Sequence, residues 1–388
     1  MRITRICPLL QLAIAWSTMF LIGTELFVMS PLIPFLAADF RISTAAAGVS
    51  VTVFSATYMV SAPVFGNVAD RVGRRRVLVS CLLIFTAANL FTASATSLAS
   101  LLAARFLAGA AAAGVSPSVY ALIDAAAPSD RRATWLGLVV SGLLMSLAFG
   151  ASAGAIAGAR FGWSPVFVLL GIFSLLLAAM NWQVWPHEAL SKDASKPQGR
   201  HPFASADLAL RLAPTVIWSM GLYGVYTYLG AGLMAIGFST DQIAEAILFY
   251  GCGAIVGVLI GGHVADRVGV KFTTGASLAG LCVCFLVLRA ALDTGLFVGP
   301  ALGVSSAVAQ LFFPAQQASL VKEFPNQRGT ALAWNNSALF FGISLGSLCG
   351  GIAVTLVSFD ANLTVCASIA LIACLINRVV SSGTQQRS

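Results

Sequence analysis

Two ionisable residues, Glu25 and Arg105, stand inside long apolar stretches of the sequence. Charged side chains are costly within a bilayer, so an intramembrane acid or base is a functional candidate by default. A carboxyl group in a low-dielectric environment holds a proton more strongly, whereas a neighbouring guanidinium promotes its release. An acid balanced between these influences can take up a proton on one side of a membrane and release it on the other. We therefore expect Glu25 and Arg105 to couple proton movement to the protein's activity; the alternative is a fixed ion pair that only joins two helices.

Elements that cross a membrane must position these two residues, because the composition leaves no other class of fold. The 388-residue chain is 58% hydrophobic and only 9% charged, and its mean hydropathy is +0.90. Soluble domains have about 25% charged and about 45–50% apolar residues. A soluble enzyme, a secreted disulfide scaffold and a disordered chain are therefore excluded, and we predict an all-α polytopic membrane protein.

Apolar runs bounded by charged residues predict twelve transmembrane helices, each near the roughly 20 residues that a bilayer requires. The predicted helices cover residues 9–34, 45–68, 77–95, 99–122, 134–158, 165–185, 214–236, 243–264, 272–290, 296–320, 329–356 and 363–380. The longest connection, 186–213, is polar and contains Pro197 and Pro202, as is typical of a linker. It would separate two six-helix bundles, 1–185 and 214–388.

The distribution of Lys and Arg orients the chain, since cytoplasmic loops are enriched in these residues. Placing the N-terminus in the cytoplasm puts 18 of the 22 Lys and Arg residues on that side; the others are Arg41, Arg160, Arg289 and the intramembrane Arg105. Both termini would then be cytoplasmic. The net charge of +8 resides in these short loops rather than in one patch, so we expect a lipid bilayer as partner and no nucleic acid.

Helix geometry puts Glu25 and Arg105 at matching depths. Glu25 lies sixteen positions into a helix that enters from the cytoplasm, about 24 Å along it at about 1.5 Å per residue. Arg105 lies six positions into a helix that enters from the opposite face, about 9 Å from that face. In a hydrocarbon core about 30 Å thick, these depths agree to within one helical turn. The two side chains are therefore expected to pair or to share one cavity.

An internal repeat relates the two halves of the chain. The segment Gly66–Gly73 (GNVADRVG) returns as Gly262–Gly269 (GHVADRVG), an offset of 196 residues, about half of the chain. Both copies follow an even-numbered predicted helix on the cytoplasmic side, so the halves are predicted to be parallel repeats. The same offset relates Arg132 to Arg328, Gly150 to Gly346, and Gly154 to Gly350.

The residues of these segments resemble a known family. The run 66–75 (Gly-x-x-x-Asp-Arg-x-Gly-Arg-Arg) resembles the signature loop of the major facilitator superfamily, and 262–271 resembles its degenerate second copy. The run Gly23–Pro34 (GTELFVMSPLIP), together with Arg105-x-x-x-Gly109, resembles the bacterial drug–proton antiporters and their arabinose-efflux-like relatives. The twelve-span, six-plus-six layout extends the resemblance over essentially the whole chain.

The fifth predicted helix departs from this pattern. Antiporters of the resembled group carry Gly-Pro in a glycine-rich stretch, whereas Gly150–Gly158 (GASAGAIAG) has no proline. Its face of small residues still predicts close packing against a neighbouring helix. The missing proline weakens export relative to import as the expected direction of transport.

The resemblance implies a mechanical role for the signature loop. Gly66 and Gly73 would permit close approach and a tight turn between two helices. Asp70 would face the positive N-terminal end of the helix that begins near Gly329 and thereby close a cytoplasmic gate.

Further charged residues complete this predicted gate. The resemblance implies that Arg74 pairs with Asp124 at the cytoplasmic end of the helix predicted at 99–122. For the arginines of the loop, anchoring of the membrane topology is the alternative role. The remaining residues assigned to the gate are Arg71, Asp266 and Arg267.

In the resembled family, the first, fourth, seventh and tenth helices line a central cavity. Polar and aromatic side chains on these helices, and on the eleventh, are candidates for contact with a small-molecule substrate, since buried polar groups need partners. For each of them, a hydrogen bond between helices or an interfacial aromatic position is an equal alternative. The residues assigned to the site are Tyr223, Tyr226, Gln317, Asn335 and Asn336; a wider set adds Trp16, Tyr120, Tyr228, Gln310 and Gln316.

These features together predict a proton-coupled secondary transporter that exports a small amphipathic compound, such as a drug or a sugar-like metabolite, by alternating access. It would act as a monomer in the inner membrane of a bacterium, driven by the proton gradient without a cofactor, a metal or ATP, and would not be an enzyme. The alternatives are a solute uptake symporter or uniporter of the same fold and a non-transporting membrane sensor. A channel would not require paired, repeated gate loops.

Overall fold

The apolar stretches of the sequence form helices throughout the part of the chain that the computed structural model describes, residues 8–128, 131–186, 206–295, 297–325 and 327–382. Within these ranges, twelve helical segments are long and apolar enough to cross a membrane. Helices suit this environment because they satisfy their backbone hydrogen bonds internally where lipid offers no partner. The predicted all-α fold with twelve spans is confirmed.

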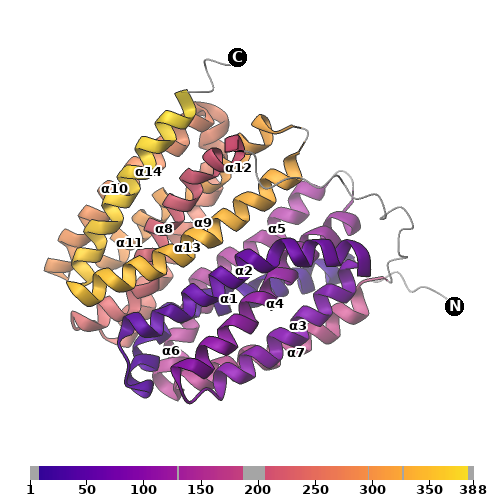
Figure 1. Ribbon diagram of the computed structural model, residues 1–388, viewed down its shortest axis with the longest axis horizontal. Helices are drawn as coiled ribbons and strands as arrows, with labels where there is room; N and C mark the ends of the chain where they lie inside the picture. Colours follow the sequence, from indigo (N-terminus) through magenta and orange to yellow (C-terminus); the bar gives the residue numbers. More distant parts are fainter. Residues whose placement is uncertain (1–7, 129–130, 187–205, 296, 326, 383–388) are drawn as a thin grey trace.

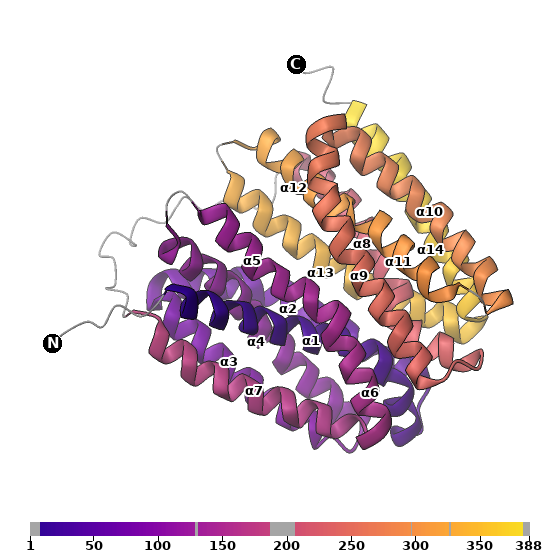
Figure 2. The same ribbon diagram turned by 180° about the vertical axis from the view of Figure 1, so that it is seen from behind.

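Two groups of helices lie side by side (Figures 1 and 2). We call them the first bundle (α1–α7, including the π-helical turn η1) and the second bundle (α8–α14). The first bundle comprises α1 (Pro8–Phe40), α2 (Thr44–Val72), α3 (Arg74–Ala93), α4 (Leu98–Ala126), α5 (Arg132–Met145), η1 (Ser146–Gly150), α6 (Ala151–Phe161) and α7 (Trp163–Val184). The second bundle comprises α8 (Ala206–Ala235), α9 (Thr240–Val268), α10 (Val270–Thr294), α11 (Val298–Gln310), α12 (Phe312–Glu323), α13 (Arg328–Leu356) and α14 (Phe359–Ser382).

The end of the predicted linker is helical rather than irregular. α8 begins at Ala206, so the last eight residues of 186–213 belong to a span, while 187–205 lie outside the described residues. Arg211, which the sequence placed in a loop, is instead an inward-turned helical residue. Its guanidinium forms an ion pair of 3.0 Å with Glu323 of α12. Because Glu323 neutralises its charge, Arg211 can lie within the N-terminal part of the apolar helix α8.

Rows of glycine hold neighbouring helices together in both bundles. In the first bundle, a Cβ at Gly150, Gly154 or Gly158 would meet an α1 side chain at 2.2, 2.1 and 2.3 Å, respectively. In the second bundle, a Cβ at the repeated Gly346 would meet the carbonyl oxygen of Met220 on α8 at 2.3 Å. Only a residue without Cβ lets these helices approach so closely. The predicted packing of the glycine-rich fifth span against a neighbour is confirmed.

The repeated loop segment produces the same backbone turn twice. Gly73 separates α2 from α3 with φ 98°, and Gly269 separates α9 from α10 with φ 100°. At each turn, the glycine N–H donates to the carbonyl oxygen four residues earlier, of Ala69 or of Ala265. A side chain would be strained at such φ values, which explains why both copies of the segment end in glycine.

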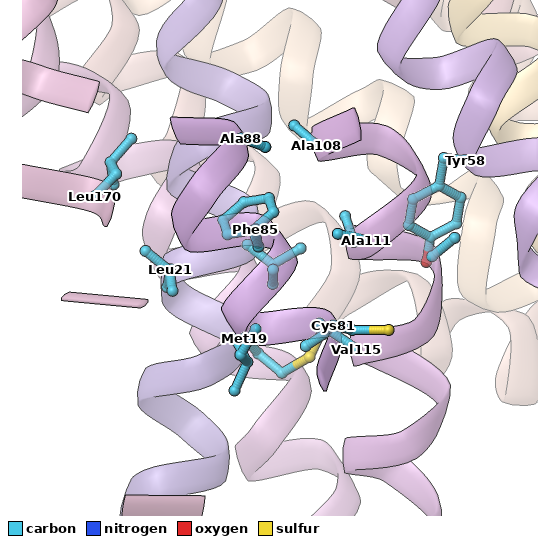
Figure 3. Packing of buried hydrophobic residues seen from close by; sticks show 14 of the residues in the cluster. Met19, Leu21, Tyr58, Cys81, Phe85, Ala88, Ala108, Ala111, Val115 and Leu170 are labelled. Atoms are coloured by element: carbon cyan, nitrogen blue, oxygen red, sulfur yellow. The ribbon is translucent and has the colours of Figure 1, made fainter. Parts of the chain in front are cut away.

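The interior of the first bundle is filled by small and apolar side chains, of which Figure 3 shows a part. Ala108, Ala111 and Val115 follow one another along α4 and lie against Cys81 and Phe85 of α3, all almost fully buried. Because alanine occupies most of the contact face of α4, the helices can pack closely and hold the polar residues of α4 in fixed positions. A second cluster of buried apolar residues fills the second bundle.

Candidate functional site

The two intramembrane charges form one buried ion pair between α1 and α4. Arg105 Nη1 donates to Glu25 Oε1, and neither side chain is exposed at all (0%). The phenyl ring of Phe54 on α2 covers the guanidinium, with 4.6 Å between its carbon Cζ and the ring centroid. The pairing that the matching depths predicted is therefore present, and the aromatic face contributed by a third helix adds a cation–π contact.

The pair is only partly satisfied. Glu25 Oε2 and the Nε and Nη2 atoms of Arg105 are buried without a hydrogen-bond partner. An inert structural pair would be expected to engage these remaining atoms, because each unsatisfied polar group in a low-dielectric interior is destabilising. The free oxygen and donors leave the carboxyl group able to exchange a proton or to bind another polar group.

α1 and α8 cross at residues that the 196-residue offset relates to each other. Ser30 Oγ donates to the carbonyl oxygen of Tyr226 at 2.5 Å, and Tyr226 is itself the repeat of Ser30. The Tyr226 hydroxyl in turn donates to the carbonyl oxygen of Phe27 at 3.0 Å. Phe27 stacks on its own repeat, Tyr223, with 6.5 Å between ring centroids and 11° between ring planes. The crossing therefore lies on the pseudo-twofold axis of the two bundles.

Two of the predicted substrate residues meet at this crossing. Tyr223 and Tyr226 line a cavity of about 10 Å³ between the bundles, together with Phe27 and Ser30. Tyr250 of α9 extends the aromatic group, with its ring centroid 5.0 Å from that of Tyr226. Sequence reasoning did not single out Tyr250, although the offset of 196 relates it to Phe54, the residue that covers Arg105. We call Phe27, Tyr223, Tyr226 and Tyr250 the aromatic cluster.

The other predicted substrate residues lie apart from the aromatic cluster. Asn335 is fully buried (0% exposed); its Oδ1 accepts a hydrogen bond of 2.7 Å from Thr215 of α8, as in the alternative of a bond between helices, and its Nδ2 has no hydrogen-bond partner. Asn336 interacts with the hydroxyl of Tyr58 on α2. Gln317 is half-buried on α12. The five residues therefore do not form one site in this conformation.

A row of small polar residues joins α2 to α13 across the two bundles. Ser347 Oγ donates to the carbonyl oxygen of Gly48 at 2.9 Å, and Ser344 Oγ lies 3.4 Å from that of Thr52. Farther along α2, the ring of Tyr58 stacks on Phe340 with 3.6 Å between centroids. These contacts run from the 41–43 loop to the middle of the spans and close the molecule on that side.

Asp70 and Arg74 of the predicted gate lie where α2 ends and α3 begins, at the end of the molecule away from the 41–43 loop. Asp70 is exposed and pairs with Arg74 at 3.7 Å, while no ion pair joins Arg74 to Asp124 among the described residues. Gly73 makes the tight turn that was predicted. The close approach expected at Gly66 is absent, because a Cβ there would meet nothing within 4 Å. Neither of these two predicted contacts, both within the first bundle, is present in the described part of the chain: Arg74 pairs with Asp70 instead, and no atom approaches the position of a Gly66 Cβ.

The remaining gate residues are exposed in both copies of the loop. This group comprises Arg71, Asp266 and Arg267. Arg75, by contrast, is 7% exposed; its guanidinium donates to the carbonyl oxygen of Trp182 on α7 and lies 4.2 Å from the centre of that residue's indole ring. Arg75 therefore joins α3 to α7. The sequence had indicated only a role of the loop arginines in anchoring the membrane topology.

The site combines one buried carboxylate–guanidinium pair with a cluster of aromatic side chains between the bundles. Among the described residues, no group of three or more His, Cys, Asp or Glu side chains is placed to hold a metal ion. The buried carboxylate, the aromatic cluster and the two-bundle architecture instead fit a site that changes its access from one side to the other.

Comparison with known proteins agrees with this geometry. The family model described as Major Facilitator Superfamily matches residues 15–240 and 219–385. An uncharacterized MFS-type transporter of Bacillus subtilis (strain 168), YceJ, is 29% identical over 346 residues, 87% of each chain. A chloramphenicol resistance protein of Streptomyces lividans is 27% identical over 269 residues, 67% of each chain.

The fold is also that of a solved transporter. The crystal structure of a D-xylose-proton symporter matches with a TM-score of 0.80 at 17% identity, covering 95% of this chain and 97% of the symporter. The matched family consists of membrane transporters and not of enzymes, and its members bind small molecules. On the agreement of fold, repeat and family model, this chain is a multi-pass bacterial membrane protein that belongs to the Major Facilitator Superfamily.

Proposed function

We propose that the protein is a proton-coupled secondary transporter that exports small amphipathic organic compounds. The observation that carries this proposal is the incompletely satisfied Glu25–Arg105 pair, the one carboxylate–guanidinium pair with 0% exposure on both sides among the described residues. A carboxyl group that exchanges its proton as access alternates links compound movement to the proton gradient. No cofactor or ATP is needed, and one chain holds the complete site, so a monomer suffices.

Alternating access follows from the position of the contacts between the bundles. Ser30–Tyr226 and Gly48–Ser347 join the bundles near the 41–43 loop, whereas the basic loops lie at the other end. With those loops and both termini in the cytoplasm of a bacterium, this conformation is closed to the outside. Outward opening requires the contacts near the 41–43 loop to part and Asp70 to approach the start of α13, as the predicted gate implies.

The aromatic cluster favours an amphipathic compound. Its rings offer apolar faces, while the hydroxyl groups of Tyr223 and Tyr226 offer hydrogen bonds at the small cavity between the bundles. The Streptomyces lividans relative is named for resistance to chloramphenicol, an aromatic compound with polar groups. This likeness supports export and an aromatic substrate class. In the present conformation the cavity is too small for such a compound, so binding requires the bundles to move.

Uptake by proton symport or by uniport is the second candidate. The observation that favours it is the absence of proline from Gly150–Gly158 in the fifth span. Uptake would use the same ion pair but would move the compound and the proton in the same direction.

The test is transport by purified protein in liposomes that enclose a pH-sensitive dye. An imposed proton gradient should drive chloramphenicol or ethidium against its own gradient, with protons moving the opposite way. Glu25→Gln should abolish this coupled movement, whereas Glu245→Gln, which changes an exposed acid on α9, should preserve it. If Glu25→Gln retained proton-driven transport, the coupling assignment would be wrong. Movement of compound and proton in the same direction would establish uptake instead.

A further inference from the structure

A third polar residue, Ser50 of α2, is fully buried at the depth of the ion pair. α2 and α4 run in the same direction, because both begin at the end of the bundle that holds the 41–43 loop. Their register is fixed where a Cβ at Gly109 would lie 2.3 Å from the carbonyl oxygen of Phe54. One turn earlier on each helix, four residues back, stand Ser50 and Arg105. Ser50 therefore lies opposite the guanidinium, on the same face of α2 as the ring that covers it.

α1 places Glu25 at the same level. Leu26 of α1 and Val51 of α2 line one cavity, and each is the neighbour in sequence of Glu25 and Ser50, respectively. Both Ser50 and Glu25 are fully buried (0% exposed). Three helices thus bring a carboxylate, a guanidinium and a hydroxyl group to one depth.

The unsatisfied atoms of these three residues are complementary. Ser50 Oγ has no hydrogen-bond partner, as is true of Glu25 Oε2 and of Arg105 Nε and Nη2. A serine hydroxyl has one donor and two acceptor positions. It can therefore donate a hydrogen bond to the free carboxylate oxygen. Four buried polar atoms without partners at one depth are unfavourable in a bilayer, unless they form hydrogen bonds with one another in some conformation of the protein.

The second bundle lacks all three residues together. The offset of 196 relates Glu25 to Gly221, Arg105 to Ala301, and Ser50 to Ala246. By contrast, Phe54 keeps an aromatic repeat in Tyr250, and the glycine rows described above are present in both bundles.

We propose that Ser50 is a positioning residue whose hydroxyl donates to the free oxygen of the Glu25 carboxylate and sets the pH at which that carboxyl group exchanges its proton. This inference rests on the proposed proton coupling. With Glu25 ionised, the Ser50 hydroxyl stabilises the charge beside Arg105; when a proton binds to Oε2, the hydroxyl turns away from it. The proton comes from and returns to the aqueous phase, and no covalent bond of the protein changes.

Among the described residues around Glu25, Arg105 is the charged group that interacts with its carboxyl group. α4 contributes the guanidinium, and α8 contributes the hydroxyl groups of Tyr223 and Tyr226 near Phe27. η1 and α6 turn small residues such as Gly150 and Gly154 toward α1. α7 meets α1 through the amide of Asn181, which bonds Thr18. Loss of the Ser50 hydroxyl therefore changes the surroundings of Glu25 by one hydrogen bond and no charge.

The test measures protonation directly and needs no substrate. Infrared difference spectra of the purified protein are recorded over a pH series, and the protonated carboxyl band that Glu25→Gln removes is followed. Ser50→Ala should move the pH midpoint of this band to more alkaline values by about one unit, a tenfold change in proton affinity. Ser50→Thr, which keeps the hydroxyl, should restore the midpoint.

Ser55→Ala is the matched control. Ser55 is also fully buried with an unpartnered hydroxyl, but it lies with Thr52 on the face of α2 that meets α13. Its loss should leave the midpoint unchanged. If the pH midpoint of Ser50→Ala equalled that of Ser55→Ala, the role of Ser50 would be excluded, while the proposed proton coupling would be unaffected. A carboxyl band of Glu25 that never appears with falling pH would overturn the proposed proton coupling itself, so the two failures are distinguishable.

Discussion

The first and second bundles pack their helices in a similar way but differ in their buried charges. Positions 25 and 105 hold a carboxylate and a guanidinium in the first bundle, while the positions 196 residues later hold Gly221 and Ala301. The backbone is nevertheless repeated closely, down to the φ values of 98° and 100° at Gly73 and Gly269. The repeat therefore preserves what helices need in order to pack and turn, and leaves out the ionisable pair.

The second bundle has aromatic hydroxyl groups at two positions where the first bundle has plain aromatic rings. Tyr250 is the repeat of Phe54, and Tyr223 is the repeat of Phe27. Tyr223 stacks on Phe27 of α1 at the pseudo-twofold crossing, and Tyr250 lies against Tyr226 of the same cluster. Under the proposed function, this difference implies that the first bundle exchanges the proton and that the second contributes most of the contacts to the compound. Five predictions test how the two bundles differ, beginning with the largest effect.

Removing one charge of the pair should destabilise the first bundle strongly. Arg105→Leu leaves the Glu25 carboxylate buried without its partner, a change that costs about 3–5 kcal/mol in comparable buried pairs. Thermal denaturation in detergent should show this loss, whereas Arg289→Leu, which changes an exposed arginine of the second bundle, should have little effect.

The double variant Glu25→Leu/Arg105→Leu separates structure from coupling. Two apolar side chains of similar size should recover most of the stability, because neither charge remains buried alone. Proton-driven transport should stay absent. Recovery of both stability and coupled transport would support the alternative, a fixed pair that only joins α1 to α4.

The sequence was sufficient for the features that depend on simple geometry. Apolar length predicts the twelve spans, and helical rise places Glu25 and Arg105 at one depth, where the structure pairs them. The crossing of α1 and α8 was not predicted, because the offset of 196 residues relates every position to its repeat and does not say which pair lies on the twofold axis. In the structure, Ser30 meets its own repeat, Tyr226.

Features that depend on packing between distant helices could not be predicted. Asn335 has the composition of a ligand-binding residue, but its partner, Thr215, lies 120 residues away on α8. Arg211 resembled a linker residue because its neutralising partner, Glu323, is equally distant in sequence. Gly66 was expected at a close approach of two helices, yet a Cβ there would meet nothing within 4 Å, because the packing angle of α2 and α3 cannot be derived from the loop motif.

Adding a methyl group to the glycine rows should affect the second bundle more than the first. Gly346→Ala would direct a Cβ at the carbonyl oxygen of Met220, 2.3 Å away, whereas Gly150→Ala would meet the hydroxyl of Thr24 at 2.2 Å. A side chain can rotate aside but a backbone cannot. We expect about 1–3 kcal/mol of destabilisation for Gly346→Ala and less for Gly150→Ala. Equal shifts of the melting temperature would show that the two rows are energetically equivalent.

The crossing of α1 and α8 should control the balance between conformations. Tyr226→Phe removes the hydrogen bond to the carbonyl oxygen of Phe27, which joins the bundles; a typical bond is worth about 1 kcal/mol. The outward-open population should rise about fivefold, as measured by spin-label distances across the 41–43 end. Ser174→Ala is the matched control, because its buried hydroxyl donates to the carbonyl oxygen of Leu82 within the first bundle. It should lower stability and leave the balance unchanged; the reverse pattern would exclude the crossing as a gate.

The smallest effect on stability, and the sharpest contrast between the repeats, should come from the loop acids. Asp70→Asn removes an exposed ion pair with Arg74, worth at most about 1 kcal/mol, while Asp266 in the second copy has Val270 where Arg74 stands in the first. The melting temperatures of Asp70→Asn and Asp266→Asn should therefore stay near that of the wild type. If Asp70 closes the cytoplasmic end by facing the start of α13, Asp70→Asn should slow transport severalfold and Asp266→Asn less. Equal slowing by both variants would mean that the repeated loops work as a symmetric pair, and the functional asymmetry would then be confined to the membrane interior.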